Sequence, residues 1–367
     1  MSGFKLYWIH PVTGEVGAYI NPESGGSFTI TLNSVEELSF TVQKKALKQL
    51  NPEWWAPLTG GALLTHTGAD NIEYPIIAGY IADWGKETLH TLEIKIKGIR
   101  GIFENRTIWQ HLEYRNTTLG EIAWQLCLHG MDRPGGHLPI TRATPDQETA
   151  ARERTYEKWN VSNNLIGKRW KEITEVINGP DLMFRPKWAN KEHTLIEWEF
   201  CAGGEAYPFI PQAWVPDFDT TPALAQIEEV SITSTGKDLV NRVWCTGSGE
   251  GEGTAIAFAE NLRSVYEHNA PFIEAVMSDS DQSTVDVLRQ KAEGALQTRQ
   301  EMIDQVTLSF LASSPKTPLG SFHVGDTANV TLAGWLSIPD GTRAMRIIKM
   351  SGDLSGKITL DFQEAKW

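Results

Sequence analysis

The feature that most constrains the fold of this chain is an internal repeat that links its two ends. The triplet Leu38-Ser39-Phe40 recurs 270 residues later as Leu308-Ser309-Phe310, and each copy lies in a run that alternates apolar and polar residues. Alternation with a period of two is the pattern of a β-strand with one buried face. The repeat therefore predicts a related β-strand near each end.

Two further elements follow in the same order at both ends. A strand-like run introduced by glycine comes first, at Gly61–Thr65 and again at Gly325–Thr331. The pairs Ile76-Ile77 and Ile347-Ile348 come next, and each is expected to open a β-hairpin.

We expect the hairpin to continue through Lys86–Leu89 in the first copy and through Lys357–Leu360 in the second. Three elements in one order at a nearly constant offset are typical of a duplicated domain. The sequence thus predicts an α+β, mainly β chain with two similar β domains and an α+β insert between them.

The expected insert begins where the apolar period changes. Thr118 and Glu121 form a capping box, and Gly130 is expected to end the helix. A second helix is predicted over 164–177, whereas the polar stretch 131–158 is interpreted as an exposed excursion. Two strands complete the insert, Leu182–Phe184 and Thr194–Phe200.

The C-terminal half contains a proline-rich stretch, a glycine-rich loop and a helix. Residues 207–222 are expected to be a linker or a segment that covers the neighbouring domain. The loop 247–253 has Glu250 and Glu252 where a phosphate-binding loop would have lysine, so it is interpreted as a hairpin tip. A helix is predicted over 283–302.

Composition limits the class of protein. The chain of 367 residues is 41% hydrophobic and 22% charged, as in a soluble globular protein. No apolar run reaches the length of a membrane span, and Met1 leads directly into Phe4–Trp8, so we expect neither a membrane span nor a signal peptide. Cys127, Cys201 and Cys245 are expected to be reduced core thiols.

The sequence contains no motif typical of a catalytic, cofactor-binding or metal site, so we predict none of these: catalytic residues none, cofactor-binding residues none, metal ligands none. The ligand-binding residues are unknown from the sequence. The nine histidines are not spaced as metal ligands, and Cys127 with His129 lie on different sides of a helix. The segment 279–290 begins like a calcium loop but lacks its glycine and its final glutamate.

Carboxylate pairs are the remaining catalytic candidates, because two acids can perform glycoside hydrolysis. The pairs considered are Glu113 with Glu121, and Asp217 with Asp219. Nothing in the sequence places either pair across a cleft, so solvated carboxylates are the preferred interpretation.

The order of elements in the C-terminal half resembles a known family. The segments concerned are Asn241–Gly247 with its glycine hairpin, Pro271–Glu274, the helix 283–302, His323–Leu332 and Arg346–Phe362. Together they resemble the minor tail proteins that form the tail-tip or baseplate hub of tailed phages. Gly101–Arg106, the capped helix and Gly179–Pro186 resemble the middle part of the same hubs.

The resemblance implies a homotrimer in which each chain supplies two tube-type β-barrel or sandwich domains. Six similar domains would form a ring beneath the hexameric tail tube, as a channel for tape measure protein and DNA. It implies domains at 1–104, 105–206 and 207–367. The net charge of −13 would suit a lumen that DNA passes without specific binding.

The resemblance also implies further partners and a location. The partners are the tail tube or distal tail protein and peripheral receptor-binding components. The expected location is the phage tail tip in the virion, after synthesis in the host cytoplasm, and no enzymatic turnover is expected.

Two alternatives remain open from the sequence. A carbohydrate-binding β protein would use exposed tryptophans such as Trp54-Trp55 or Trp214. A cell-wall glycan hydrolase of the tail tip would depend on one of the carboxylates.

Overall fold

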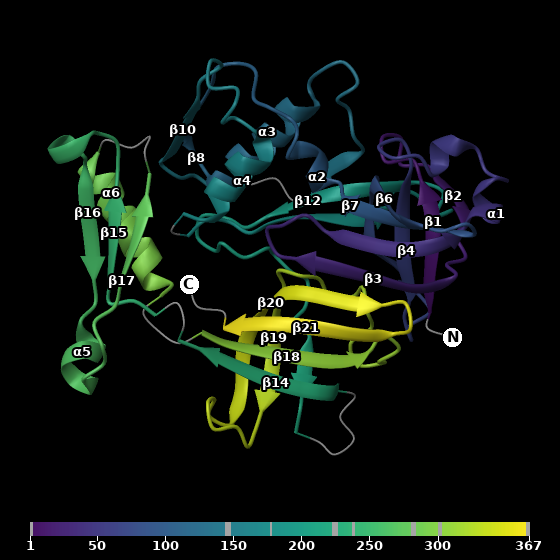
Figure 1. Cartoon of the computed structure of the whole chain (residues 1–367). Helices are drawn as coiled ribbons and strands as arrows, with labels where there is room; N and C mark the ends of the chain where they lie inside the picture. The colour runs from purple at the N-terminus through teal and green to yellow at the C-terminus, as the bar shows by residue number, and fades with distance from the viewer. Residues whose placement is uncertain are drawn as a thin grey trace. The chain divides into compact units, whose positions relative to one another are not determined.

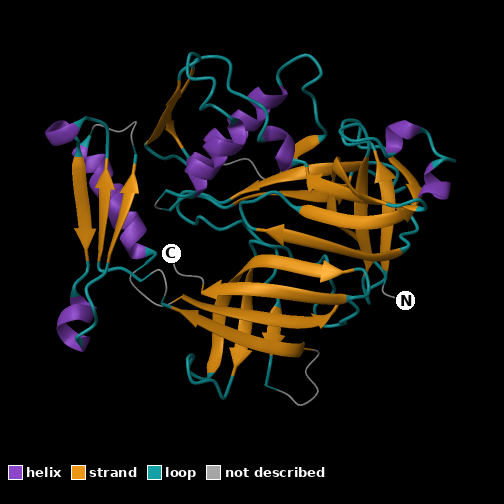
Figure 2. Ribbon diagram, viewed as in Figure 1, coloured by secondary structure: helices purple, strands orange, loops and turns teal. Residues whose placement is uncertain are grey.

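Two compact units make up the structure, a computed structural model that describes residues 3–143, 148–176, 178–221, 227–236, 239–279, 284–299 and 303–364. The larger unit spans Met1–Ser231 and Val306–Trp367, and the smaller spans Ile232–Gln305. Strands dominate both units (Figures 1 and 2). The prediction of an α+β, mainly β protein is confirmed.

The N-terminal β domain lies in the larger unit. Its strands are β1 (Phe4–Ile9), β2 (Val16–Tyr19), β3 (Ser24–Thr31), β4 (Glu37–Gln43), β5 (Gly61–Thr67), β6 (Glu73–Glu87) and β7 (Thr91–Gly98). Their hydrogen-bonded order is β3-β4-β7-β6-β5-β1-β2. Helix α1 (Lys44–Leu47) and the short 3-10 helix η1 (Pro52–Trp54) connect β4 to β5. Alternate residues of β4 are buried, as the sequence pattern predicts.

The C-terminal β domain repeats this strand order. Its strands are β13 (Asp217–Asp219), β14 (Ile227–Thr235), β18 (Ile303–Leu311), β19 (Thr327–Leu332), β20 (Gly341–Asp353) and β21 (Lys357–Glu364). They follow one another as β14-β18-β21-β20-β19-β13, which matches β3-β4-β7-β6-β5-β1. The two Leu-Ser-Phe triplets lie in the corresponding strands β4 and β18.

A shared irregularity strengthens the match. The β6–β7 ladder shifts register between Ile81 and Asp83, and the β20–β21 ladder shifts between Ile347 and Lys349. The residues of β6 and β20 that flank the shift thus correspond, with an offset of 266 residues. A bulge retained at the same place indicates that β6 and β20 share local backbone geometry. The match is weaker at the margin, because β13 runs parallel to β19 whereas β1 runs antiparallel to β5.

One part of the predicted repeat is wrong. Lys86–Leu89 is not the second strand of a hairpin, since β6 continues to Glu87 and the turn follows it. Thr88 makes this turn, because its hydroxyl oxygen accepts a hydrogen bond from the backbone N–H of Thr91 at 3.0 Å. Lys357–Leu360 does open β21, whose counterpart is β7. Thr88 belongs to the turn, although the segment Lys86–Leu89 resembles the strand residues Lys357–Leu360 in sequence.

The two β domains are joined edge to edge. The outer half of β20 pairs antiparallel with β3, with Lys349 opposite Thr31 and Asp353 opposite Ser27. In Figure 1 the yellow β20 lies beside the purple β3. One open sheet therefore runs through both domains, and neither domain closes into a barrel within the described ranges.

The insert packs against the N-terminal β domain. Its elements are α2 (Arg100–Phe103), β8 (Leu112–Thr117), α3 (Leu119–Met131), β9 (Ile140–Arg142), β10 (Arg152–Tyr156), α4 (Ile166–Thr174), β11 (Leu182–Trp188) and β12 (Ile196–Ala202). The predicted cap is present, since the Thr118 hydroxyl oxygen accepts from the Glu121 N–H at 3.1 Å. Helix α4 falls within the predicted 164–177, of which Ile177 lies outside the described residues.

The prediction that 131–158 is an exposed excursion is wrong in part. Strand β9 pairs with β12, and β10 pairs with β8. Exposure alternates along Arg152–Tyr156 as in a strand, since Glu153 and Thr155 are exposed and Tyr156 on the other face is buried. The charge of this stretch concealed the alternation. Residues 144–147 lie outside the described ranges.

The smaller unit is a three-stranded sheet with one helix against it. Its elements are β15 (Arg242–Thr246), the 3-10 helix η2 (Gly251–Gly253), β16 (Ile256–Glu260), α5 (Arg263–His268), β17 (Glu274–Ser278) and α6 (Val285–Gln297). The strand order is β16-β15-β17. Leu288 and Leu296 of α6 are buried with Val243 and Cys245 of β15 in one cluster.

The glycine-rich loop is a hairpin tip, as predicted, because β15 and β16 pair antiparallel around it. Helix α6 lies within the predicted 283–302, although residues 280–283 and 300–302 fall outside the described part. Of the predicted stretch 207–222, the described residues 207–221 cover the C-terminal domain, where Phe209, Ile210 and Phe218 are buried. The predicted boundaries at 104 and 206 stay predictions. The sequence did not indicate a separate compact unit within 207–367.

Candidate assembly surfaces

The cysteine considered as a nucleophile is not accessible. Cys127 is fully buried in α3, and burial raises the pKa of its thiol well above the usual range. A catalytic thiol needs a lowered pKa and access to substrate. Cys201 and Cys245 are buried too, which confirms the prediction of core thiols.

The carboxylate pairs considered for hydrolysis are engaged in separate local contacts. Glu121 forms an ion pair with Arg142, while Glu113 forms one with Arg115. Asp219 accepts a hydrogen bond from the backbone N–H of Thr221 at 2.9 Å. Glu113, Glu121 and Asp219 are thus engaged in structural contacts, and Asp217 is exposed in β13.

The tryptophans considered for sugar binding are held by neighbouring groups. Trp54 packs on His10 with ring centroids 4.3 Å apart, and Trp55 stacks on Trp84 at 5.5 Å. Trp214 is 41% exposed, and its indole N–H donates to the backbone oxygen of Ser321 at 2.8 Å. They do not form one platform.

Strand β11 of the insert links the two β domains through buried charges. At one end, the Asp181 carboxylate accepts from Arg346 of β20 at 2.9 Å and from Asn33 of the β3–β4 turn at 3.1 Å. Asn33 in turn accepts from the Leu182 N–H at 2.7 Å. Burial raises the pKa of Asp181 in spite of Arg346. Three parts of the larger unit thus meet at one carboxylate.

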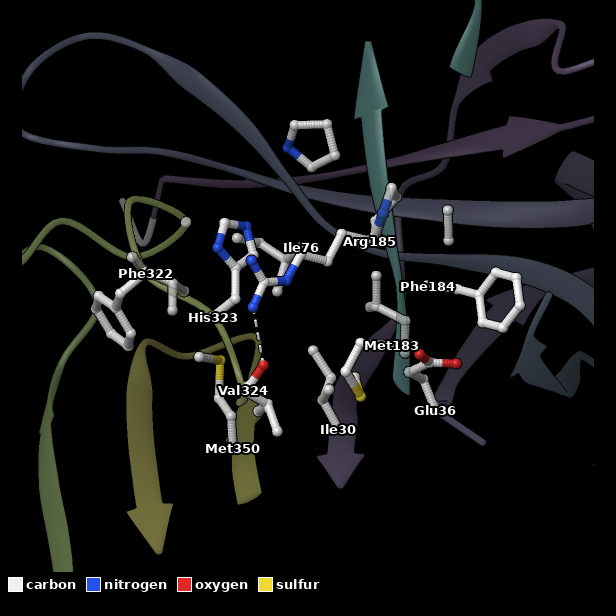
Figure 3. Close-up of a pocket in the computed structure, with 16 residues that line it drawn as sticks. Ile30, Glu36, Ile76, Met183, Phe184, Arg185, Phe322, His323, Val324 and Met350 are labelled. Carbon is white, nitrogen blue, oxygen red and sulfur yellow. Dashed lines mark hydrogen bonds between the residues drawn. The ribbon is translucent and has the colours of Figure 1, made fainter. Parts of the chain in front are cut away.

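The other end of the same buried run carries a second ion pair. Arg185 donates to the Asp326 carboxylate at 2.8 Å and to the backbone oxygen of Val324 at 3.2 Å, and the second of these bonds is the dashed line in Figure 3. Burial alone would raise the pKa of Asp326, but a hydrogen bond from His323 and the charge of Arg185 outweigh burial and lower it. The sequence analysis missed this junction. The sequence feature that could have indicated the junction is the apolar run Leu182–Phe184 between Asp181 and Arg185.

A small cavity lies beside this junction (Figure 3). It measures about 30 Å³, which leaves room for one or two water molecules. Glu36 lines it, and neither carboxylate oxygen of Glu36 has a hydrogen-bond partner among the described residues. Burial raises the pKa of Glu36 to about 7, although the nearby charge of Arg100 opposes this rise.

Several strands of the sheet in the larger unit have a strand on one side alone in the described chain, among them β14, β2 and β13. Strand β14 stands at one end of the hydrogen-bonded order in the described chain. Strand β6 pairs with β5 only as far as Tyr80, so beyond Ile81 its outer edge has no strand beside it in the described ranges. Open edges present unpaired N–H and C=O groups to other chains.

The smaller unit has its own open surface. The sheet face opposite α6 carries Trp244, Phe258 and Val276 side by side across three strands. Phe258 is 43% and Val276 70% exposed. The guanidinium of Arg242 lies 5.0 Å from the Phe258 ring centroid and forms ion pairs with Glu260 and Glu274. This face therefore exposes apolar side chains beside Arg242, whose charge is balanced by Glu260 and Glu274.

No helix in the described part of the chain is long and apolar enough to cross a membrane. Among the same residues, no group of three or more His, Cys, Asp or Glu side chains is placed to hold a metal ion.

Two β domains of one strand order, joined edge to edge and accompanied by an α+β insert, form a fold that is similar to the folds of solved tail proteins. The tail protein from Neisseria meningitidis MC58 is 11% identical and has a TM-score of 0.58, with 99% of this chain and 97% of that chain covered. The 43 kDa tail protein of prophage MuSo2 from Shewanella oneidensis is 11% identical with a TM-score of 0.56, and 98% of each chain is covered.

A chain of the Francisella PdpA-VgrG complex is 8% identical with a TM-score of 0.52, and covers 98% of this chain and 57% of its own length. No protein-family model and no curated protein matches the sequence. The similarity concerns the fold, and the resemblance to phage tail proteins predicted from the sequence is confirmed at that level.

Proposed function

We propose that this chain is a structural component of a phage tail tip, a hub whose three copies form a ring. The observation that carries the proposal is the edge-to-edge union of two β domains with the same strand order. Similar domains joined edge to edge can repeat one heterologous contact from copy to copy, and such contacts form a ring when the rotation between neighbours closes on itself.

In this role the ring closes the distal end of the tail tube and forms a channel for tape measure protein and DNA. The acidic balance of the chain supports a conduit that DNA passes without specific binding, because strong DNA binders gain affinity from lysine and arginine. Receptor-binding components would attach to the periphery. The function needs no turnover, and the chain would act in the virion after synthesis in the host cytoplasm.

The buried ion pairs at Asp181 and Asp326 support this role, because they hold the two β domains in one orientation. A ring built from two-domain chains closes only if that orientation is fixed.

Negative-stain electron microscopy of the purified protein at high concentration tests the proposal. We expect class averages with threefold or apparent sixfold symmetry and an open centre. Compact monomers at every concentration, alone and with the tail tube protein added, would contradict the ring.

A further inference from the structure

The smaller unit presents an apolar sheet face that none of its described elements covers. Across this face Trp244 of the central strand β15 lies opposite Phe258 of β16 and Val276 of β17. Val276 is 70% exposed, and Ile256 in the next row is 49% exposed. The Trp244 and Phe258 ring centroids are 4.9 Å apart, so the apolar side chains form one continuous patch. A contiguous apolar patch on a soluble protein marks a binding surface.

The sequences of the three strands are those of a sheet that is covered on both faces. Each strand contains a run without a polar residue, and these runs are Val243–Cys245, Ile256–Ala259 and Ala275–Met277. Strands β15 and β17 are parallel, and parallel strands are usually buried on both sides, which gives continuous apolar runs. Helix α6 covers one side, where Leu288 and Leu296 are buried (Figure 2). The other side lacks the layer that these runs predict.

A helix has the dimensions to form this missing layer. Neighbouring strands are about 4.8 Å apart, so a row of three side chains spans about 10 Å, which is the diameter of a helix with its side chains. On the covered face α6 packs on the strands through Leu288, Ala292 and Leu296, which recur at every fourth residue. An extended partner strand would instead add to the edge of β16 or β17 and leave the face exposed.

The charges beside the patch favour a basic partner. One row further along the strands, Arg242 lies between Glu260 and Glu274 and forms ion pairs with them at 2.6 and 3.3 Å. This row is negative, because two carboxylates face one guanidinium. The sequence of the smaller unit contains twice as many acidic as basic side chains, so the unit as a whole attracts cations. Lysine or arginine at the margins of a bound helix would approach Glu260 and Glu274.

The side chains of this face are ordered by contacts with one another. The Trp244 indole N–H donates to the Glu274 carboxylate at 2.7 Å. The Arg242 guanidinium lies 5.0 Å from the ring centroids of both Phe258 and Phe272. Side chains that are already ordered lose little conformational entropy on binding, which favours affinity.

We infer that the face of β16-β15-β17 binds an amphipathic helix of another protein. The apolar stripe of this helix packs on Trp244, Phe258 and Val276, and its lysine or arginine residues face Glu260 and Glu274. This function belongs to the smaller unit and does not depend on the proposed ring.

A synthetic helix tests the apolar contact. The probe is a fluorescein-labelled peptide of about 18 residues, composed of leucine and lysine with leucine at helical spacing. Its binding to the full-length chain is measured by fluorescence anisotropy. We expect saturable binding to the wild type and a dissociation constant about tenfold higher or more for Val276→Ser and for Phe258→Ser.

Leu336→Ser is the matched control for these variants. It removes a fully exposed leucine of the C-terminal domain and should bind the peptide as the wild type does. Absence of binding to the wild type, or equal binding to Val276→Ser and Phe258→Ser, would overturn the inference.

A second comparison tests the charge. The same peptide with glutamate in place of lysine should bind at least about tenfold more weakly at low salt. Glu274→Gln should weaken binding of the lysine peptide by about threefold or more, whereas Glu293→Gln, at an exposed acid of α6, should not. Equal losses for the two variants would mean that net charge alone attracts the peptide, and would refute the assigned contact.

Sedimentation tests a rival occupant of the face, a second copy of this chain. Analytical ultracentrifugation should give the same mass for the wild type and for Val276→Ser at every concentration. Association that Val276→Ser abolishes would assign the face to a second copy and contradict the helix.

Discussion

The two β domains share a strand order and differ in what covers the edge of their longest strand. In the C-terminal domain β3 covers β20, and in the N-terminal domain no described strand covers the matching part of β6. One chain thus contains a bound and an unbound form of the same edge. The edge of β20 contributes to the stability of the single chain. The matching edge of β6 is available for contact with another chain.

A second difference concerns the link between the first two strands of each domain. Residues 32–36 connect β3 to β4, whereas residues 236–302, which make up most of the smaller unit, stand between β14 and β18. A domain that is complete with a five-residue turn does not need the larger connection for its own fold, so the smaller unit is an addition to the repeat.

The largest effect is expected where a charge of the covered junction loses its partner. Asp326→Ala leaves the partly buried Arg185 without its carboxylate, and we expect a loss of about 3 kcal/mol in the free energy of unfolding. Chemical denaturation followed by tryptophan fluorescence measures it. Glu267→Ala removes an exposed ion pair with Arg263 and should cost under about 1 kcal/mol. Equal losses would mean that the junction charges do not hold the domains together.

The next effect compares the two strands at corresponding positions. Met350→Ala removes a buried side chain and should cost about 2 to 3 kcal/mol. Trp84→Ala removes a half-exposed ring and should cost about 1 kcal/mol in the monomer. Denaturation of dilute, monomeric protein measures both. A larger cost for Trp84 would mean that its stacking on Trp55 and its hydrogen bond to the Trp55 oxygen contribute more to stability than the burial of Met350 does.

Glu36 gives the junction a dependence on pH. Its folded-state pKa of about 7 lies above the unfolded value, so its stabilising contribution is complete below about pH 4.5 and is lost as the pH rises through 7. Glu36→Gln removes the charge that wild-type Glu36 carries at pH 8, so the variant should be more stable than the wild type at that pH. We expect a gain of about 1 to 2 kcal/mol, because the unpartnered amide keeps part of the cost of burying a polar group. The two proteins should differ least near pH 5. A difference that is constant between pH 5 and pH 8 would contradict the assignment.

The smallest effect is expected from removing the smaller unit. Replacement of residues 236–302 by a short glycine-serine turn should leave the two β domains folded, with a melting temperature within about 5 °C of the wild type. Circular dichroism during heating measures this. Loss of the cooperative transition would show that the two domains depend on the smaller unit after all.

The sequence predicted the repeat, because each domain buries alternate residues of its strands and alternation is visible without a structure. Leu38 and Phe40 of β4 show this directly. The sequence also predicted helix α3, since Thr118 and Glu121 are a local cap signal. Local patterns of this kind report on a single element.

The junction could not be predicted in the same way. Asp181 meets Asn33 and Arg346, which lie 148 and 165 residues away in the chain, and no periodicity connects them. The pairing of β3 with β20 is equally non-local. The same holds for the open edge of β6, since an edge is defined by strand neighbours, and strand neighbours are set by the tertiary fold.

The pairing of β3 with β20 also has a consequence for folding during synthesis on the ribosome. The covering segment Lys349–Asp353 is made more than 300 residues after Thr31. At translation rates of about 5 to 20 residues per second, β3 waits roughly 15 to 65 seconds for its partner. During that interval the edge of β3 is unpaired and can contact nascent chains on the same messenger RNA. The rate of elongation then affects how much of the protein folds correctly.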